Sequence, residues 1–221
     1  QQLEKLGVQG FLPKPVVGVN GNGMHTNISL AKGGKNLFYK KDGKDGLSDS
    51  AWDFTNRILA NASDLCLILN PSVNAYRRLD PHFEAPNQIK VSPTDRGSMI
   101  RIPTGNEKST RIEVRSVGPD ANPYMTYYAI LRTGLEGPTL EVDEAKRSRT
   151  RFLPDNIFDA IRLFKGSKFM SELLSDTVHE KFADIKMAQA ERCPKALGTR
   201  VKEGEIMFHH EVTNQYLWNQ F

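Results

Sequence analysis

The residues best suited to chemistry in this sequence are charged side chains that gather between positions 76 and 115. They are Arg77, Arg78, Lys90, Arg96, Arg101, Lys108, Arg111 and Arg115, together with Glu84 and Glu113. Guanidinium groups present a planar fork of donors that suits phosphate and carboxylate, and a carboxylate among them can hold a divalent cation. The composition therefore indicates a site for anionic ligands. A solvated strand face with surface ion pairs is the alternative.

Strand geometry predicts how the densest part of this group is arranged. In TRIEVR, residues 110–115, alternation along a strand places the charged side chains on one face and the aliphatic ones on the other. The charged side chains are those of Arg111, Glu113 and Arg115. In SMIRIP, residues 98–103, the same alternation directs Arg101 away from two isoleucines. We expect this second strand to add a cation to the same surface.

A second group lies in the glycine-rich segment VNGNGMHTNISL, residues 19–30. Gly21 and Gly23 permit backbone conformations closed to other residues and a close approach to a ligand, and His25 follows at the start of a predicted strand. A tight turn at NGNG and a structural role for His25 are the alternatives. No GKS or GKT follows, so the segment is not a phosphate-binding P-loop.

A third candidate is the segment PHFEAPNQ, residues 81–88, whose prolines predict an ordered loop between a helix and the next strand. Glu84 on such a loop is either a residue of a mobile lid or a surface acid. The sequence contains no GxSxG, HExxH or paired CxxC motif, which argues against a hydrolase of those classes and against a cysteine zinc site.

The elements that must position these residues change in character along the chain. Four short extended runs predict a mainly antiparallel β first half: Met24–Ser29, Asn36–Tyr39, Met99–Ile102 and Thr110–Arg115. Helices are predicted at residues 47–69, 122–137, 156–164 and 168–192. We predict one domain over 1–221, with a β-rich part at 1–137 that carries the motifs and a helical part at 138–221.

Two details of the predicted helices bear on the site and the surface. Ser48 or Asp49 suits the start of the first helix, and Asn122 is a good N-cap for the second. The tyrosines of the second helix recur at helical spacing, which favours a place in the core or an interface over a platform for stacking bases. They are Tyr124, Tyr127 and Tyr128.

Composition limits the classes of partner. The chain has 221 residues, 38% of them hydrophobic and 25% charged, and its formal net charge is only +4. This balance is typical of a globular protein and makes neither nucleic acid nor a membrane the expected partner. The two cysteines, Cys66 and Cys193, are far apart, and no apolar run is long enough to span a membrane or has the flanks of a signal peptide. We therefore expect a cytoplasmic location.

Three long segments in order resemble the C-terminal catalytic region of glutamine synthetase. They are FLPKPVVGVNGNGMHTNISL at 11–30, NPSVNAYRRLDPHFEAPNQIKVSPTDRGSMIRIP at 70–103 and RIEVRSVGPDANPYMTYYAILRTGLEG at 111–137. The resemblance implies an α+β fold in which an antiparallel sheet packs with helices, the glutamine synthetase/guanido kinase-like catalytic domain. It also implies ligation of glutamate and ammonia through γ-glutamyl phosphate, with ATP and Mg²⁺ or Mn²⁺ as cofactors.

The resemblance also implies roles for individual residues. His25 and Glu113 match ligands of the metal ion that binds the ATP phosphates, and Asn20, Gly21 and Arg78 match contacts to glutamate. The residues that match catalytic groups are Glu84 on a flap, Arg96 and Arg115, and Arg115 also matches a contact to the glutamate γ-carboxylate. The residues that match nucleotide contacts, or support them, are Ser29, Lys108, Arg111 and Arg101.

Departures from the family pattern limit what the resemblance implies. Asn27 stands where many relatives carry a second histidine, and Thr94 stands where an arginine is frequent. The family's N-terminal domain and its other metal-binding carboxylates precede the first matching segment, so we expect this chain alone to be nearly inactive and the full-length enzyme to be a homo-oligomer. A polyamine or another amine as acceptor, and a non-catalytic binding or assembly role, are the alternatives.

Overall fold

The computed structural model describes residues 11–15, 19–80, 85–103, 105–139 and 151–191 of the chain. Its main sheet has four strands in the order β1 (Thr26–Ile28), β6 (Ile112–Val114), β5 (Ser98–Arg101) and β4 (Gln88–Ser92). A separate two-stranded sheet joins β2 (Ala31–Lys32) to β3 (Lys35–Asn36). With the helices, these strands make the α+β class that was predicted.

One strand pair of the main sheet departs from the antiparallel arrangement. β1 with β6 and β6 with β5 are antiparallel, whereas β4 and β5 are parallel. Only a short segment connects β4 to β5, and polar contacts fold it tightly: Ser92 Oγ accepts from the amides of Thr94 and Asp95, and Asp95 Oδ1 accepts from the amide of Gly97 at 2.7 Å. The alternation of residues in the sequence carries no information on strand direction, so it did not predict that β4 and β5 are parallel.

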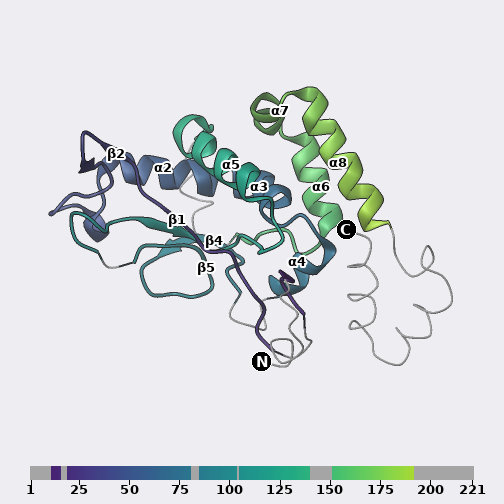
Figure 1. Cartoon of the computed structure of the whole chain (residues 1–221), viewed down its shortest axis with the longest axis horizontal. Helices are drawn as coiled ribbons and strands as arrows, with labels where there is room; N and C mark the ends of the chain where they lie inside the picture. Colours follow the sequence, from purple (N-terminus) through teal and green to yellow (C-terminus); the bar gives the residue numbers. More distant parts are fainter. Residues whose placement is uncertain (1–10, 16–18, 81–84, 104, 140–150, 192–221) are drawn as a thin grey trace.

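Helices cover one side of the sheet and extend beyond it (Figure 1). The helices of the described residues are α2 (Asp49–Ala60), α3 (Ala62–Leu69), α4 (Val73–Arg78), α5 (Pro123–Glu136), α6 (Ile157–Gly166), α7 (Lys168–Leu174) and α8 (Asp176–Ala190), with a 3-10 turn η1 (Lys44–Gly46). α2 packs against α5, and α3 packs against both α5 and α6. α6, α7 and α8 form a helical group at one end of the molecule.

The core lies between the helices and the apolar side of the sheet. Phe54 and Ile58 of α2, Leu65 of α3, Ile100 of β5 and Val114 of β6 belong to one buried cluster. Burying such side chains gives about 1.5–3 kcal/mol each, which makes this layer the main source of stability for the strands. The same strands carry the charged residues on their opposite side, so the core fixes the position of the site.

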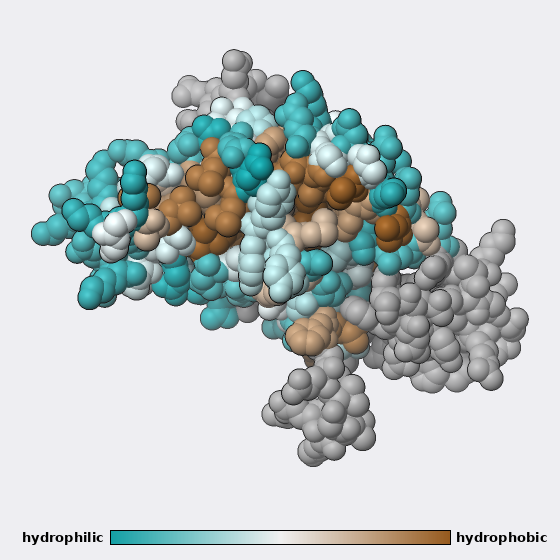
Figure 2. Space-filling model, turned by 45° about the horizontal axis from the view of Figure 1, so that its top comes forward, coloured by the Kyte–Doolittle hydropathy of each residue, from teal (hydrophilic) through white to brown (hydrophobic). Residues whose placement is uncertain are grey.

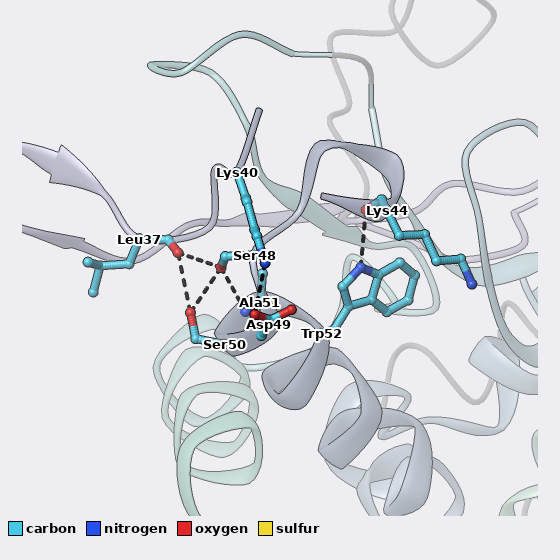
Figure 3. A network of polar contacts seen from close by, with 8 residues as sticks. All are labelled: Leu37, Lys40, Lys44, Ser48, Asp49, Ser50, Ala51 and Trp52. Carbon is cyan, nitrogen blue, oxygen red and sulfur yellow. Dashed lines mark hydrogen bonds and ion pairs between the residues drawn. The ribbon is translucent and has the colours of Figure 1, made fainter. Parts of the chain in front are cut away.

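Hydrogen bonds connect the start of α2 to the loop before it (Figure 3). Ser48 is the N-cap, as predicted: its hydroxyl accepts from the amide of Ala51 at 3.2 Å and donates to the carbonyl of Leu37 at 2.6 Å. Trp52 donates its indole N–H to the carbonyl of Lys44 at 3.1 Å. These bonds satisfy groups that a helix start leaves open and hold the segment after β3 against α2.

Two predicted helices are each divided in the structure. The segment predicted as one helix at 47–69 breaks at Asn61, whose side-chain amide donates to the carbonyl of Arg57 at 2.8 Å and to that of Pro138 at 2.9 Å. The segment predicted at 168–192 breaks at Ser175, which has a φ of 70°. At each break one helix ends and the next begins, so each of the two predicted segments forms two helices.

The tyrosines of α5 lie on the surface and not in the core. Tyr124, Tyr127, Tyr128, Leu131 and Leu135 form a stripe along the helix, and Tyr124 is 84% exposed. Figure 2, which brings the top of Figure 1 forward, shows hydrophobic side chains exposed on this side of the molecule. No helix in the described part of the chain has the length and apolar character that crossing a membrane requires.

Candidate active site

The charged side of the main sheet collects side chains from three neighbouring strands. In the ladder, Glu113 of β6 lies opposite Asn27 of β1 on one side and opposite Arg101 of β5 on the other. Directly opposite residues project to the same face of a sheet. The prediction that Arg101 and Glu113 share one surface is therefore confirmed.

Glu113 is the centre of this surface. It is only 5% exposed, and its two carboxylate oxygens face different partners. Oε1 lies 2.9 Å from Nδ1 of His25, and Oε2 lies 2.5 Å from Nε of Arg101. A carboxylate buried to this degree requires such partners, because an unpaired buried charge is strongly destabilising.

His25 lies just before β1, where the glycine-rich segment joins the sheet. Burial lowers the pKa of His25, Glu113 raises it, and the cations Arg115 and Arg78 lower it further, so that the net shift is downward. A histidine whose pKa lies below its ordinary value is neutral at pH 7 and has a free nitrogen lone pair. His25 therefore has the form that binds a metal ion.

Arg78, at the end of α4, is held by the backbone of the segment that follows β6. Its Nη1 donates to the carbonyl of Ser116 at 3.0 Å, and its Nη2 donates to the carbonyl of Arg115 at 2.8 Å. Burial and the nearby charge of Arg115 lower the pKa of Arg78 to about 10, so the side chain still carries its charge at pH 7. Arg78 is thus a buried cation with a fixed position.

The glycines of NGNG permit close approach to Arg78. A Cβ added at Gly23 would lie 2.4 Å from Nη2 of Arg78, and one added at Gly21 would lie 2.3 Å from the carbonyl oxygen of Pro13. Both distances are shorter than any side chain tolerates. A side chain at Gly21 would therefore require the backbone to shift, whereas one at Gly23 would require the guanidinium of Arg78 to move, and neither glycine has a positive φ.

Arg115 joins β6 to the turn after β4. Its amide donates to the carbonyl of Met99 at 2.8 Å, and its Nη1 donates to the carbonyl of Arg96 at 2.5 Å. Arg115 is buried, whereas the side chain of Arg96 is exposed on the turn. The backbone of Arg115 also lies beside Arg78, because Nη2 of Arg78 donates to the carbonyl of Arg115 at 2.8 Å.

The residues predicted to contact the nucleotide lie near the end of β1 and the start of β6. Arg111 donates from Nε to Oδ1 of Asn27 at 2.9 Å. Lys108 is exposed on the turn before β6, and Ser29 is exposed directly after β1. Asn20 is exposed in the segment that precedes His25, and Glu84 lies outside the described residues.

Two site residues were missed by the sequence analysis in the roles that the structure gives them. Asn27 was noted only as a departure from the family, yet its side chain contacts Arg111 and lies beside Glu113. Asp120 was not noted at all, although both of its carboxylate oxygens are shielded from solvent. A single acid in a loop after a strand has no pattern that would mark it.

The donor set fits a hard divalent cation. Among the described residues no group of three or more histidine, cysteine or acidic side chains lies together. His25 and Glu113 offer one nitrogen and one carboxylate oxygen 2.9 Å apart, which suits Mg²⁺ or Mn²⁺ because these ions keep several water or phosphate ligands. A histidine and a carboxylate beside guanidiniums form the class of site that is suited to metal–phosphate and carboxylate groups.

Comparison with known proteins supports this class of site and identifies the protein family. Residues 5–200 match the family described as glutamine synthetase, catalytic domain. The glutamine synthetase of Staphylococcus epidermidis strain ATCC 35984 is 40% identical over 191 residues, and that of Staphylococcus aureus strain MRSA252 is 38% identical over 191 residues. Each match covers 80% of this chain and 43% of the relative.

Solved structures give the same result for the fold. GmaS without ligand has a TM-score of 0.68 and 33% identity, covering 84% of this chain and 45% of that one. GmaS in a complex with ADP has a TM-score of 0.69 and 33% identity, covering 84% of this chain and 46% of that one. The chain belongs to the glutamine synthetase catalytic-domain family, a family of ligases that use ATP and a divalent metal. It spans less than half the length of these relatives.

Proposed function

We propose that this chain is the catalytic region of a ligase that joins glutamate to ammonia through γ-glutamyl phosphate. The observation that carries the proposal is Glu113, a buried carboxylate held between His25 and Arg101 on a surface that also contains Arg78 and Arg115. This surface offers a metal position beside fixed cations, which is what transfer of a phosphoryl group between two anionic substrates requires.

The metal ion would be held by His25 and Glu113. When bound, Mg²⁺ or Mn²⁺ would neutralise charge on the ATP phosphates. Arg78, Gly21 and Asn20 would bind glutamate, with the fixed guanidinium of Arg78 facing one of its carboxylates. This assignment agrees with the close approach of the glycine-rich segment to Arg78.

The remaining residues would act on the phosphoryl group and the nucleotide. Arg115 would stabilise the transferring phosphoryl group and the γ-carboxylate, with Arg96 beside it, and Glu84 would close over the acyl phosphate so that ammonia reaches it before water. The nucleotide phosphates would contact Lys108 and Arg111, with Ser29 and Arg101 in support. The structure of the similar protein GmaS was solved in a complex with ADP, which supports a nucleotide as a substrate.

A second candidate keeps the chemistry and changes the acceptor. The resemblance to the family leaves a polyamine or another amine as an alternative nucleophile, and the chain is similar both to GmaS and to the staphylococcal glutamine synthetases. We further propose that the full-length protein is a cytoplasmic homo-oligomer, of which this chain is the C-terminal part. Product formation by the full-length protein with ammonia and with putrescine separates the two acceptors.

The role of Glu113 can be tested with a nearly isosteric change. In the full-length protein, Glu113→Gln should lower kcat/KM for Mg²⁺-dependent ADP release by about two orders of magnitude, because a metal ligand loses its charge. Thermal unfolding should show that the variant still folds. Glu136→Gln is the matched control, because Glu136 is an exposed acid paired with Arg132 on α5. Unchanged kinetics in Glu113→Gln would refute the metal assignment.

A further inference from the structure

A buried asparagine of α4 holds the segment that precedes the glycine-rich part of the site. Asn74 is 4% exposed, and its side-chain amide binds both backbone groups of Lys14. Its Oδ1 accepts from the amide of Lys14 at 2.6 Å, and its Nδ2 donates to the carbonyl of Lys14 at 3.0 Å. The two bonds satisfy polar groups that are buried, so they fix the position of residues 11–15 on α4.

The side chain of Lys14 extends this connection to residues 19–22, which we call the substrate loop because they contain the proposed glutamate contacts Asn20 and Gly21. Lys14 is only 5% exposed, and its Nζ donates to the carbonyl of Val19. A buried ammonium group requires an acceptor of this kind. The hydrogen bond therefore fixes the backbone at the start of the substrate loop.

The other end of the substrate loop binds the same segment. The backbone amide of Asn22 donates to the carbonyl of Pro13 at 2.7 Å, and its side-chain Nδ2 donates to the carbonyl of Leu12 at 2.9 Å. Residues 12–14 thus provide acceptors or donors to both ends of the substrate loop. The part of the loop between these ends is held from behind by a segment that is itself held by Asn74.

Arg78 packs closely against the substrate loop. The position of a Cβ at Gly21 lies 3.1 Å from Cγ of Arg78 and directly against the carbonyl oxygen of Pro13. Asn74 and Arg78 are four residues apart on α4, so they lie on the same side of this helix. One helix therefore positions both the segment behind the substrate loop and the arginine that packs against it.

We propose that Lys14 and Asn74 are positioning residues for glutamate binding, which hold the backbone of the substrate loop in a fixed place relative to the guanidinium of Arg78. The inference rests on the proposed function, in which the substrate loop and Arg78 bind glutamate. The chain beyond the loop is held separately, because the amide of Met24 donates to the carbonyl of Val117 at 2.9 Å and β1 then pairs with β6. Loss of the Lys14 ammonium should therefore weaken glutamate binding and leave the nucleotide side of the site unchanged.

Steady-state kinetics of the full-length protein test the inference. Lys14→Met removes the ammonium group and keeps an apolar stem of similar length. We expect it to raise KM for glutamate by about tenfold and KM for ATP by less than about twofold, because a small displacement of a substrate-binding group is costly only for the substrate that it binds. Lys165→Met is the matched control, because Lys165 is an exposed lysine of α6 paired with Asp184. It should leave both KM values unchanged.

The outcomes separate this inference from the proposed function. If the wild-type protein forms no glutamyl product with ammonia or an amine, the proposed function fails and the inference fails with it. If the wild type is active and Lys14→Met raises both KM values equally or neither, only the positioning role is wrong.

A second variant decides the question should Lys14→Met not fold. Asn74→Asp keeps the shape of the side chain and the acceptor for the amide of Lys14, but an oxygen replaces the Nδ2 that donates to the carbonyl of Lys14. Repulsion between these two oxygens should displace the segment behind the substrate loop. A selective rise in KM for glutamate supports the inference, and a value within about twofold of the wild type overturns it.

Discussion

At the scale of single residues, the buried charged side chains of the site are held by specific polar partners. Glu113 lies between His25 and Arg101, and the guanidinium of Arg78 is held by the carbonyls of Arg115 and Ser116. Such an arrangement is specific because a buried charge that loses its partner is strongly destabilised. It also means that a substitution at one position changes the protonation of its neighbours.

Asp120 gives a pH dependence whose sign is fixed by its environment. Its folded-state pKa lies above the value of about 3.9 for the unfolded chain, so folding favours the protonated acid. The stabilisation is fully present below the unfolded pKa and is lost as the pH rises through the folded pKa. Asp120→Asn cannot titrate. The Tm of this variant relative to the wild type should therefore be higher at pH 7 than at pH 4, as measured by thermal unfolding at both pH values. A relative Tm that falls as the pH rises would contradict this assignment.

At the scale of secondary-structure elements, the packing of α2 against α5 depends on a glycine within a helix. A Cβ at Gly134 of α5 would lie 2.3 Å from the ring of Phe54 on α2. Gly134→Ala should therefore destabilise the protein by about 1–2 kcal/mol, because overpacking outweighs the gain of about 1 kcal/mol in helix propensity. Urea denaturation measures the change.

Gly166, the last residue of α6, is the matched control for this prediction. No atom lies within 4 Å of the position that a Cβ at Gly166 would occupy, and its φ is not positive. Gly166→Ala should leave the free energy of unfolding unchanged or raise it slightly. Equal effects of the two substitutions would mean that α2 and α5 do not pack as described.

The elements show which features the sequence could predict. Alternation in residues 110–115 predicted the charged face of β6, and the N-caps Ser48 and Asn122 predicted two helix starts, because these signals are local. The break at Asn61 depends on a contact with Pro138, which is distant in the sequence. The exposed tyrosines of α5 have the spacing of a buried face, so only the tertiary structure shows which side is covered.

The candidate site likewise combines features that the sequence predicted with features that depend on tertiary contacts. The resemblance to the family, and not spacing alone, predicted that His25 and Glu113 belong together, and the structure places them 2.9 Å apart. The contact between Asn27 and Arg111 depends on the register of the strands. The burial of Asp120 depends on tertiary packing. No short sequence motif encodes either feature. The functional roles of all the site residues, including Glu84, Asn20 and Ser29, remain predictions.

At the scale of the whole molecule, the length of the relatives bears on activity. The chain spans 43% of the staphylococcal glutamine synthetases and 45% of GmaS. Among its described residues we propose only His25 and Glu113 as metal ligands, and no group of three or more histidine, cysteine or acidic side chains lies together there. A site that transfers a phosphoryl group needs its charges neutralised from all sides, so under the proposed function we expect groups outside the described residues to complete the site.

We therefore expect the isolated chain to be folded and nearly inactive. With saturating glutamate, ammonia and Mg·ATP, a coupled assay of ADP release should give a rate at least 100-fold below about 10 s⁻¹, a usual turnover number for an enzyme. The full-length protein, assayed at the same concentration, is the positive control, and this chain with Glu113→Gln sets the background. Turnover by the isolated chain at a rate near that of the full-length protein would show that the 221 residues contain a complete site. The remaining ligands would then have to be sought among the residues outside the described ranges, which are 1–10, 16–18, 81–84, 104, 140–150 and 192–221.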